Sequence, residues 1–506
     1  MKAPQALEKL HLRDRENRHL ERAVAVLRWD QETFLPEEGV EDRSEQLALL
    51  ETYAHEHLTA NENGNLLSEL GSSTENPGGD EKLPPLERDF IKVFRRNYDR
   101  AIKLPVSFVS DLAKAEGISQ AAWINARRDN DFNAFLPYLV KMIEFSRCKA
   151  SYWGFTEKPY DGLLDIYESG MGADEVSTVF NPMGKQLSAL LKKITSYPRP
   201  ESSFLDRVFD VEGQTHFSRD LMKRLDFDSS RGRLDVSAHP FTTSLGSNDV
   251  RLTTKYMPRH VQTSIFSTIH EIGHAFYEMD FPRELQGTCL ADGASMGIHE
   301  SQSRLWENVI GRSYSFWESM FPVLRSIFPG VLSMVSMDVF YRAINLVEPS
   351  LIRIEADEVT YSLHIILRFE LEKELLSGSL DPAKLPEAWW GKMKTLLGVE
   401  PNIDSQGVLQ DVHWSMGAFG YFPSYALGNI YGLQFWDKLK SDIPAAEKLI
   451  ADGNFAPIRA WLKDTIYVWG RRLDPQELLK TVTGKTLSAE PFLSYIEKKY
   501  SGVYGF

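Results

Sequence analysis

The chain has 506 residues, of which 42% are hydrophobic and 25% are charged, the ordinary balance of a protein that buries a substantial core. Its formal net charge is -14 at pH 7, and the lysines and arginines are spread along the chain rather than gathered in a basic block. This distribution argues against nucleic acid and anionic membranes as partners. The two cysteines, Cys148 and Cys289, are too few for a disulfide framework and too isolated for a CxxC metal clip.

The N-terminal sequence MKAPQALEKLHLRDREN becomes charged within a few residues, so it lacks the apolar segment of a secretory signal. No stretch reaches the roughly 18 consecutive apolar residues that a membrane span requires. We therefore expect a cytoplasmic protein with no membrane partner.

Apolar residues recur at spacings of three and four along most of the chain, for example at Leu47, Leu50 and Tyr53, which predicts a mainly α-helical fold. Residues 61–85 are rich in Gly, Ser, Asn and Pro, a composition typical of a mobile surface connection. We expect residues 1–85 to form an N-terminal helical lid and its flexible connection, within a single domain that spans residues 1–506.

Residues 236–256 depart from the helical pattern. Thr, Val and Phe are interrupted there by Gly-Ser-Asn-Asp at 246–249, which predicts a β-hairpin. A small sheet just before the helix described next could hold an extended peptide along its edge by main-chain hydrogen bonds. A purely structural hairpin is the alternative.

Residues 258–280 are predicted to form one helix, which contains His270, Glu271 and His274 in an HExxH pattern. Residues four apart lie on one helix face about 6 Å apart, so two imidazoles can converge on one metal ion. Glu271 lies beside that face and can act as the general base toward water. Two solvated histidines on a helix surface are the alternative.

A catalytic zinc ion takes three protein ligands and leaves one position for water. Glu278 lies on a similar face but about 6 Å beyond the second histidine, so we reject it. Glu300, in a second predicted helix over residues 297–310, follows that histidine by 26 residues, enough for a turn and a return. His299 and Asp292 are the alternatives, and each is expected to be a supporting or capping group.

Several short segments form an ordered set of motifs from residue 29 to residue 428: WDQET at 29–33, HPF at 239–241, DVRLT at 249–253, HEIGH at 270–274, HESQSRLWE at 299–307, IR at 352–353 with ADEVTY at 356–361, GVLQDVHW at 407–414, and GAFGYFPSYALG at 417–428. Together they resemble the M32 family of metallocarboxypeptidases, the thermostable carboxypeptidase type. The resemblance covers nearly the whole chain, and an ordered set is far more specific than one short motif.

The resemblance implies a mostly helical peptidase fold with a deep cleft, usually a homodimer, that releases single C-terminal residues from peptides with broad side-chain tolerance. It also implies one Zn²⁺ per chain held by His270, His274 and Glu300, with Glu271 as the base. Cobalt or manganese could occupy the same ligands. One departure from other zinc peptidases with a glutamate ligand is Arg304, four residues after Glu300, where several of them have an aspartate that supports a ligand histidine.

A carboxypeptidase must recognise a free carboxylate, and a planar guanidinium with paired charge-assisted hydrogen bonds suits that task. Arg251 and Arg353 are the candidates. A structural salt bridge is the alternative for each arginine. For Arg353, which is predicted to open a helix, the expected partners would be Glu355, Asp357 and Glu358.

Hydrolysis builds negative charge on the carbonyl oxygen of the bond that is cut, so donors are expected around it. His413, Tyr421 and Tyr425 are the candidates, and Tyr425 is preferred over Tyr421 because its spacing from His413 is similar to that of a His and Tyr pair in helical zinc oligopeptidases. Tyr421 and His239 are expected to contact substrate, although each could instead be a core residue. Asp411 could orient His413, but residues two apart do not share a helical face.

Two other functions remain open at this stage. One is a zinc oligopeptidase or dipeptidyl carboxypeptidase with the same helical architecture. The other is a helical binding protein that retains an inert metal site.

Overall fold

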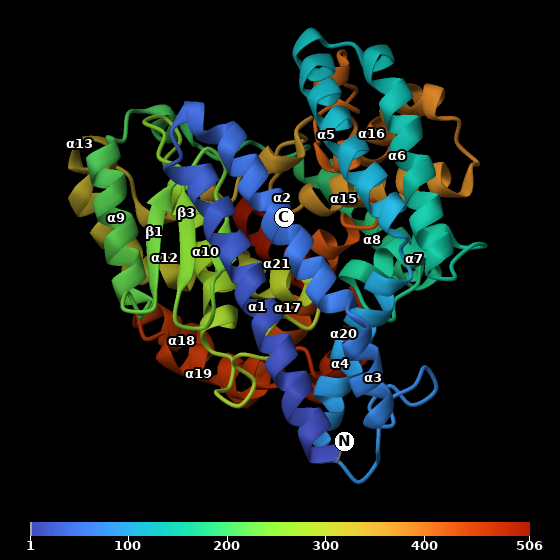
Figure 1. Cartoon of the computed structure of the whole chain (residues 1–506). Coiled ribbons are helices and arrows are strands. Elements are labelled where there is room, and N and C mark those ends of the chain that lie inside the picture. The colour runs from blue at the N-terminus through green and yellow to red at the C-terminus, as the bar shows by residue number, and fades with distance from the viewer. Residues whose placement is uncertain (1–2) are drawn as a thin grey trace.

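The computed structural model describes residues 3–506, which are mainly helical with one three-stranded sheet, so the predicted fold class is confirmed (Figure 1). The helices and strands, in chain order, are α1 (Ala3–Thr33), α2 (Val40–Thr59), α3 (Asn61–Glu69), α4 (Pro85–Ile102), α5 (Val106–Asp129), α6 (Phe132–Tyr152), α7 (Pro159–Tyr167), α8 (Ala173–Ile194), α9 (Val211–Arg224), β1 (Gly232–Val236), β2 (Thr242–Ser244), β3 (Val250–Thr254), α10 (Val261–Met279), α11 (Met296–Arg304), α12 (Tyr314–Ile327), α13 (Pro329–Leu332), α14 (Met337–Ile344), α15 (Tyr361–Ser377), α16 (Leu385–Leu397), α17 (Pro423–Asp442), α18 (Ala446–Ala451), α19 (Ala456–Thr465), α20 (Pro475–Thr483) and α21 (Glu490–Tyr504).

The N-terminal layer packs through an apolar cluster of its own, in which α1, α3 and α4 meet residues 285–290. Helix α2 contributes no buried residue and lies against α1, which runs along the front of the molecule in Figure 1. The prediction that residues 61–85 form an irregular connection is wrong for residues 61–69. Residues 61–69 form α3, because Leu66 and Leu67 find buried positions that composition alone does not reveal.

The sheet has the strand order β1-β3-β2. Strands β2 and β3 are antiparallel, with Thr242 opposite Leu252, and their turn places Gly246 at a φ of 131°, which favours glycine. These two strands are the hairpin that the sequence predicts. The parallel strand β1, which pairs with β3 from the other side, is an addition that the sequence pattern did not indicate.

Helix α10 lies against β3 and is buried on most of its circumference. Its apolar residues Ile265, Ile269, Ile272 and Phe276 follow the spacing of three and four that one helix face requires. The helix begins at Val261, three residues later than predicted, because residues 258–260 form the turn that leads into it. The two histidines of the HExxH motif therefore stand on a rigid element held by the core.

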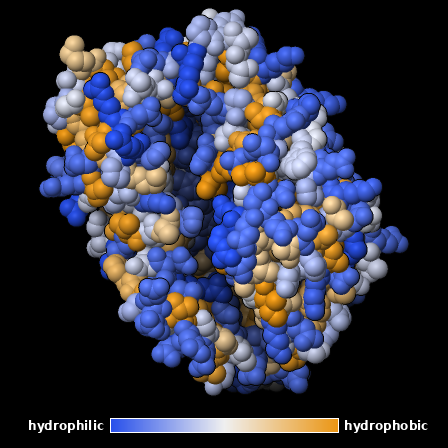
Figure 2. All heavy atoms as spheres, turned by 90° about the horizontal axis from the view of Figure 1, so that it is seen from above, coloured by the Kyte–Doolittle hydropathy of each residue, from blue (hydrophilic) through white to orange (hydrophobic). Residues whose placement is uncertain are grey.

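A deep groove runs across the upper face of the molecule, and its walls are mainly hydrophilic (Figure 2). In Figure 1 the sheet lies on one side of the molecule with α9, α10 and α12, and helices α5 to α8, α15 and α16 form the other side. No helix within residues 3–506 combines the length and the apolar character needed to cross a bilayer.

Candidate active site

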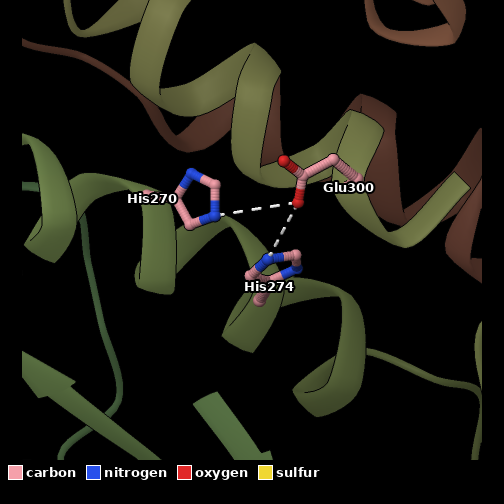
Figure 3. A group of neighbouring side chains, drawn as sticks. All are labelled: His270, His274 and Glu300. Carbon is pink, nitrogen blue, oxygen red and sulfur yellow. Dashed lines mark ion pairs between the residues drawn. The ribbon is translucent and has the colours of Figure 1, made fainter. Parts of the chain in front are cut away.

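His270 and His274 lie one turn apart on α10, and Glu300 approaches them from α11. Figure 3 shows a ring nitrogen of each histidine directed toward one carboxylate oxygen of Glu300. The Nε2 atoms of His270 and His274 lie 3.7 and 3.5 Å from Glu300 Oε2, and one ligand atom from each of the three residues lies within 4.8 Å of the others. The structure thus brings the three predicted ligands together.

The two histidine–glutamate distances are close to those that a tetrahedral metal requires. With metal–ligand bonds of about 2.0–2.2 Å, neighbouring ligand atoms of a tetrahedral site lie about 3.3–3.5 Å apart. A site of two imidazoles and one carboxylate also leaves the fourth position that a catalytic metal needs. The side chains of this chain therefore fit a divalent metal with little rearrangement.

His270 is oriented by Glu307, whose Oε2 lies 2.8 Å from the His270 Nδ1. Burial alone would raise the pKa of Glu307, but the hydrogen bond from His270 and the charge of Arg304 lower it to about 2. Glu307 lies in a π-helical segment, Leu305–Ile310, that continues α11. Glu307 therefore supplies the carboxylate that supports a ligand histidine, which Arg304 cannot supply. Glu307 follows Glu300 by seven residues, about two helical turns, and this spacing could have indicated from the sequence that the two carboxylates lie on one helix face.

His274 is oriented by His299, since their Nδ1 atoms are 2.6 Å apart and His299 Nε2 lies 2.8 Å from Glu278 Oε1. If His274 Nε2 faces a metal, the His274 proton lies on Nδ1 and is donated to His299, which in turn donates to Glu278. Both ring nitrogens of His299 are thus engaged by His274 and Glu278, so His299 supports the site and is not available as a metal ligand. Asp292 instead pairs with Arg471 at 3.3 Å.

The Glu307–His270 hydrogen bond leads to a first prediction. Glu307→Gln keeps the shape of the side chain but removes the charge that makes His270 a stronger donor to a metal, so we expect metal affinity to fall about 10- to 100-fold. Competition for Zn²⁺ against a coloured chelator measures the change. The matched control is Glu318→Gln on α12, an exposed glutamate, which should leave the affinity at its original value. An unchanged affinity in the Glu307 variant would contradict this role.

Glu300 is held as an ion by Arg304, whose Nε donates to Glu300 Oε1 at 2.6 Å. Burial acts to raise the pKa of Glu300, but the charges of Arg304 and His270 prevail and hold that pKa well below its usual range. The guanidinium of Arg304 also lies over the ring of Tyr361, 4.2 Å from its centre. Glu300 is therefore ionised, the form in which a carboxylate can bind a metal ion.

Two glycines allow the helices of the site to approach each other closely. A Cβ added at Gly273 on α10 would lie 2.6 Å from the Gln302 carbonyl oxygen of α11, and one added at Gly428 on α17 would lie 2.6 Å from Glu300 Cγ. Distances this short are impossible for real Cβ atoms, so α11 is packed between α10 and α17 at contacts that only glycine permits. The position of Glu300 follows from this packing.

Glu271 is buried, and the hydroxyl of Thr242 on β2 donates to its Oε2 at 2.6 Å. Burial raises the pKa of Glu271, although His270 and the hydrogen bond from Thr242 oppose the shift. A raised pKa suits a general base that must both take and return a proton near neutral pH. The small sheet thus holds the side chain of the HExxH glutamate.

His413, Tyr421 and Tyr425 form one aromatic cluster. His413 Nε2 lies 3.4 Å from the Tyr425 hydroxyl, and the rings of Tyr421 and Tyr425 are 5.1 Å apart. Burial, aided by Arg353 and Arg368, lowers the pKa of His413 to about 4, so His413 is neutral near pH 7. Burial raises the pKa of Tyr421 to about 12 and raises the pKa of Tyr425 well above its usual value, so both phenols keep their protons and can donate.

Arg353 lies beside this cluster and is bound to Asp411. Its Nη2 is 2.9 Å from Asp411 Oδ1, and its Nη1 donates to the Tyr361 hydroxyl at 3.1 Å. Asp411 also binds Arg368, at 2.7 Å from its Nε. The ion-pair partners suggested by sequence proximity, residues 355–358, are therefore wrong, because the segment is a single 3-10 turn (Arg353–Glu355) and the chain fold brings Asp411 to the guanidinium.

Arg251 and His239 lie on the sheet side of the site. Arg251 binds Asp249 through Nε and Nη2, at 3.0 and 2.9 Å, and its guanidinium lies 4.3 Å from the ring centre of Trp29 on α1. His239 is exposed in the loop between β1 and β2. Trp29 thus connects the N-terminal layer to the sheet, an interaction that sequence motifs alone do not specify.

Comparison with known proteins agrees with this geometry. The family model described as Carboxypeptidase Taq (M32) metallopeptidase matches residues 9–500. The chain is 42% identical over 503 residues to thermostable carboxypeptidase 1 of Thermus thermophilus, covering 97% of each chain, and 39% identical to carboxypeptidase 1 of Bacillus subtilis, covering 96% of each. The crystal structure of an M32 carboxypeptidase from Deinococcus radiodurans superimposes with a TM-score of 0.96 at 38% identity, covering 99% of this chain and 100% of the other.

These matches extend over nearly the whole chain, and the site contains three side chains that could hold a metal ion, with a buried glutamate beside them. The chain belongs to the Carboxypeptidase Taq (M32) metallopeptidase family and is a metal-dependent carboxypeptidase.

Proposed function

We propose that the protein releases single amino acids from the free C-terminus of peptides, with broad side-chain tolerance, and uses one Zn²⁺ held by His270, His274 and Glu300. The convergence of these three ligands beside Glu271 is the observation that carries the proposal. Membership of a carboxypeptidase family favours this reaction over that of an oligopeptidase, and it argues against an inert binding protein.

A divalent metal supplies Lewis acidity toward a carbonyl group and a water when it is bound. Glu271 takes a proton from the water and passes it to the leaving amine. Its Oε2 accepts the hydrogen bond from Thr242, which leaves Oε1 for the proton transfer. Tyr425, with His413 beside it, donates a hydrogen bond to the carbonyl oxygen as negative charge develops there.

Arg353 is the better candidate for the substrate carboxylate. It stands in the same cluster as Tyr425, 5.1 Å from the centre of that ring, whereas Arg251 lies on the sheet side against Trp29. Each arginine already binds a carboxylate through Nε and Nη2, Arg353 with Asp411 and Arg251 with Asp249, so position within the site decides between them. Asp411 neutralises part of the charge of Arg353 and fixes its plane, which preorganises the guanidinium for a carboxylate. We assign Arg251, His239 and Tyr421 to contacts with the rest of the peptide.

A peptide pair tests the proposed function. We expect an N-acylated peptide with a free C-terminus to lose one residue, and its C-terminal amide to react about 10- to 150-fold more slowly in kcat/KM, the equivalent of about 1.5–3 kcal/mol for hydrogen bonds to a charged group. Arg353→Gln should abolish most of this difference, while Arg251→Gln should retain it. Mass spectrometry of the products separates release of single residues from release of dipeptides.

Equal cleavage of the acid and the amide would identify an endopeptidase, and dipeptide products would identify a dipeptidyl carboxypeptidase. If Arg251→Gln rather than Arg353→Gln removed the difference between the two peptides, the carboxylate would bind at the sheet side. Zinc as the native metal, the homodimer and the cytoplasmic location stay predictions from the sequence and its resemblance.

A further inference from the structure

Glu168 follows α7 directly, and its carboxyl group is fully buried. Burial outweighs the hydrogen bonds that the group accepts and raises its pKa to about 7. Burying a carboxyl group is costly unless its neighbours satisfy it. The role of this glutamate therefore lies in what it binds.

The Oε1 atom of Glu168 joins two helices. It accepts a hydrogen bond from the backbone N–H of Gly297, and the Ser424 hydroxyl donates to the same atom at 3.1 Å. Gly297 is the second residue of α11, and Ser424 is the second residue of α17. The first turn of a helix has free N–H groups and the positive end of the helix dipole, so an acceptor oxygen is favourable at both places.

The contact depends on the absence of a side chain at Gly297. A Cβ added there would lie 2.5 Å from Glu168 Oε1. Glycine at this position therefore lets the carboxyl group reach the backbone of α11. Ser295, the N-cap of α11, accepts from the backbone N–H of Ile298, so Glu168 serves a different donor of the same turn.

The two helices that Glu168 joins carry the proposed metal ligand Glu300 and the proposed hydrogen-bond donor Tyr425. Glu300 lies one turn beyond Gly297 on α11, and Tyr425 directly follows Ser424 on α17. The same helices cross where an added Cβ at Gly428 would meet Glu300 Cγ. Two contacts, one at the helix starts and one at the crossing, thus set the relative position of α11 and α17.

We propose that Glu168 is a positioning residue that fixes the start of α11 to the start of α17, and so sets the distance between Glu300 and Tyr425. This inference rests on the proposed roles of Glu300 as a metal ligand and Tyr425 as a hydrogen-bond donor. Glu168 itself acts through Gly297 and Ser424 and touches neither substrate nor metal.

Three substitutions of Glu168 separate the effect of side-chain length from the effect of the negative charge. Glu168→Gln keeps the length and the acceptor oxygen, Glu168→Asp keeps the carboxylate but is one methylene shorter, and Glu168→Ala removes the group. We expect the Gln variant to stay within about threefold of the original protein in both Zn²⁺ affinity and kcat. The Asp and Ala variants should lose about tenfold or more in both, with a smaller change in KM, because small displacements of reacting groups are costly.

Zn²⁺ affinity is measured by competition with a coloured chelator, and kcat and KM with the N-acylated peptide. Ile458→Ala on α19, a fully buried core position, controls for lower stability and should reduce the thermal midpoint without changing Zn²⁺ affinity. The inference is overturned if the Ala variant keeps its Zn²⁺ affinity within about threefold, or if Asp restores function as well as Gln does. If the original protein failed to hydrolyse peptides, the proposed function would fail, yet the order of Zn²⁺ affinities would still decide this inference.

Discussion

Glu271→Gln is expected to lower kcat about 10²- to 10⁴-fold while the protein still binds one metal ion per chain. The amide has the size of the carboxylate and can still accept the hydrogen bond from Thr242, but it cannot take a proton. Because Glu271 lies beside the three proposed ligands and is not one of them, the metal affinity should change little. Steady-state kinetics and elemental analysis of the same preparation measure both quantities.

Glu318→Gln, the same chemical change at an exposed position on α12, serves as the control and should keep full activity. A Glu271 variant that retained a tenth or more of kcat with its metal bound would rule out this residue as the general base. Loss of the metal together with activity would instead show that Glu271 acts mainly on the stability of the site.

Gly273→Ala is expected to have the largest structural effect. The new Cβ would lie 2.6 Å from two backbone atoms, the Gln302 oxygen and Ser303 Cα, and backbone cannot rotate away as a flexible side chain can. Separating α10 from α11 should cost about 1–3 kcal/mol or more of the free energy of unfolding. It should also move Glu300 away from His270 and His274, so metal affinity should fall as well. Chemical denaturation and Zn²⁺ competition measure the two effects.

Gly391→Ala on α16 is the matched control, because an added Cβ at this helical glycine meets nothing within 4 Å. That change should stabilise the protein by about 0.5–1 kcal/mol, since alanine loses less conformational freedom than glycine in a helix. If Gly273→Ala proved as harmless as Gly391→Ala, the tight packing of α10 on α11 would not be what positions the ligands.

Local patterns in the sequence were sufficient for the helical fold, the β2–β3 hairpin and the HExxH helix, and the wider set of motifs was sufficient for the family. Each pattern depends on neighbours in the chain: the spacing of four puts His270 and His274 on one face of a helix whatever surrounds it. Composition was a less reliable predictor of irregular structure. Residues 61–85 are rich in loop-forming residues, yet residues 61–69 fold into α3.

The sequence by itself determined the candidate metal ligands and the candidate base, because residue type and the spacing of the HExxH motif decide which side chains are suited to that chemistry. The sequence already indicated His299 as a supporting residue, but only the tertiary structure decided which side chain each support holds: Glu307 holds His270, His299 holds His274, and Asp411 holds Arg353. These partners lie 25 to 58 residues apart in the chain, so no periodicity relates them. Their contacts exist only because the packed helices bring distant segments within hydrogen-bond distance, and that packing depends on the whole core.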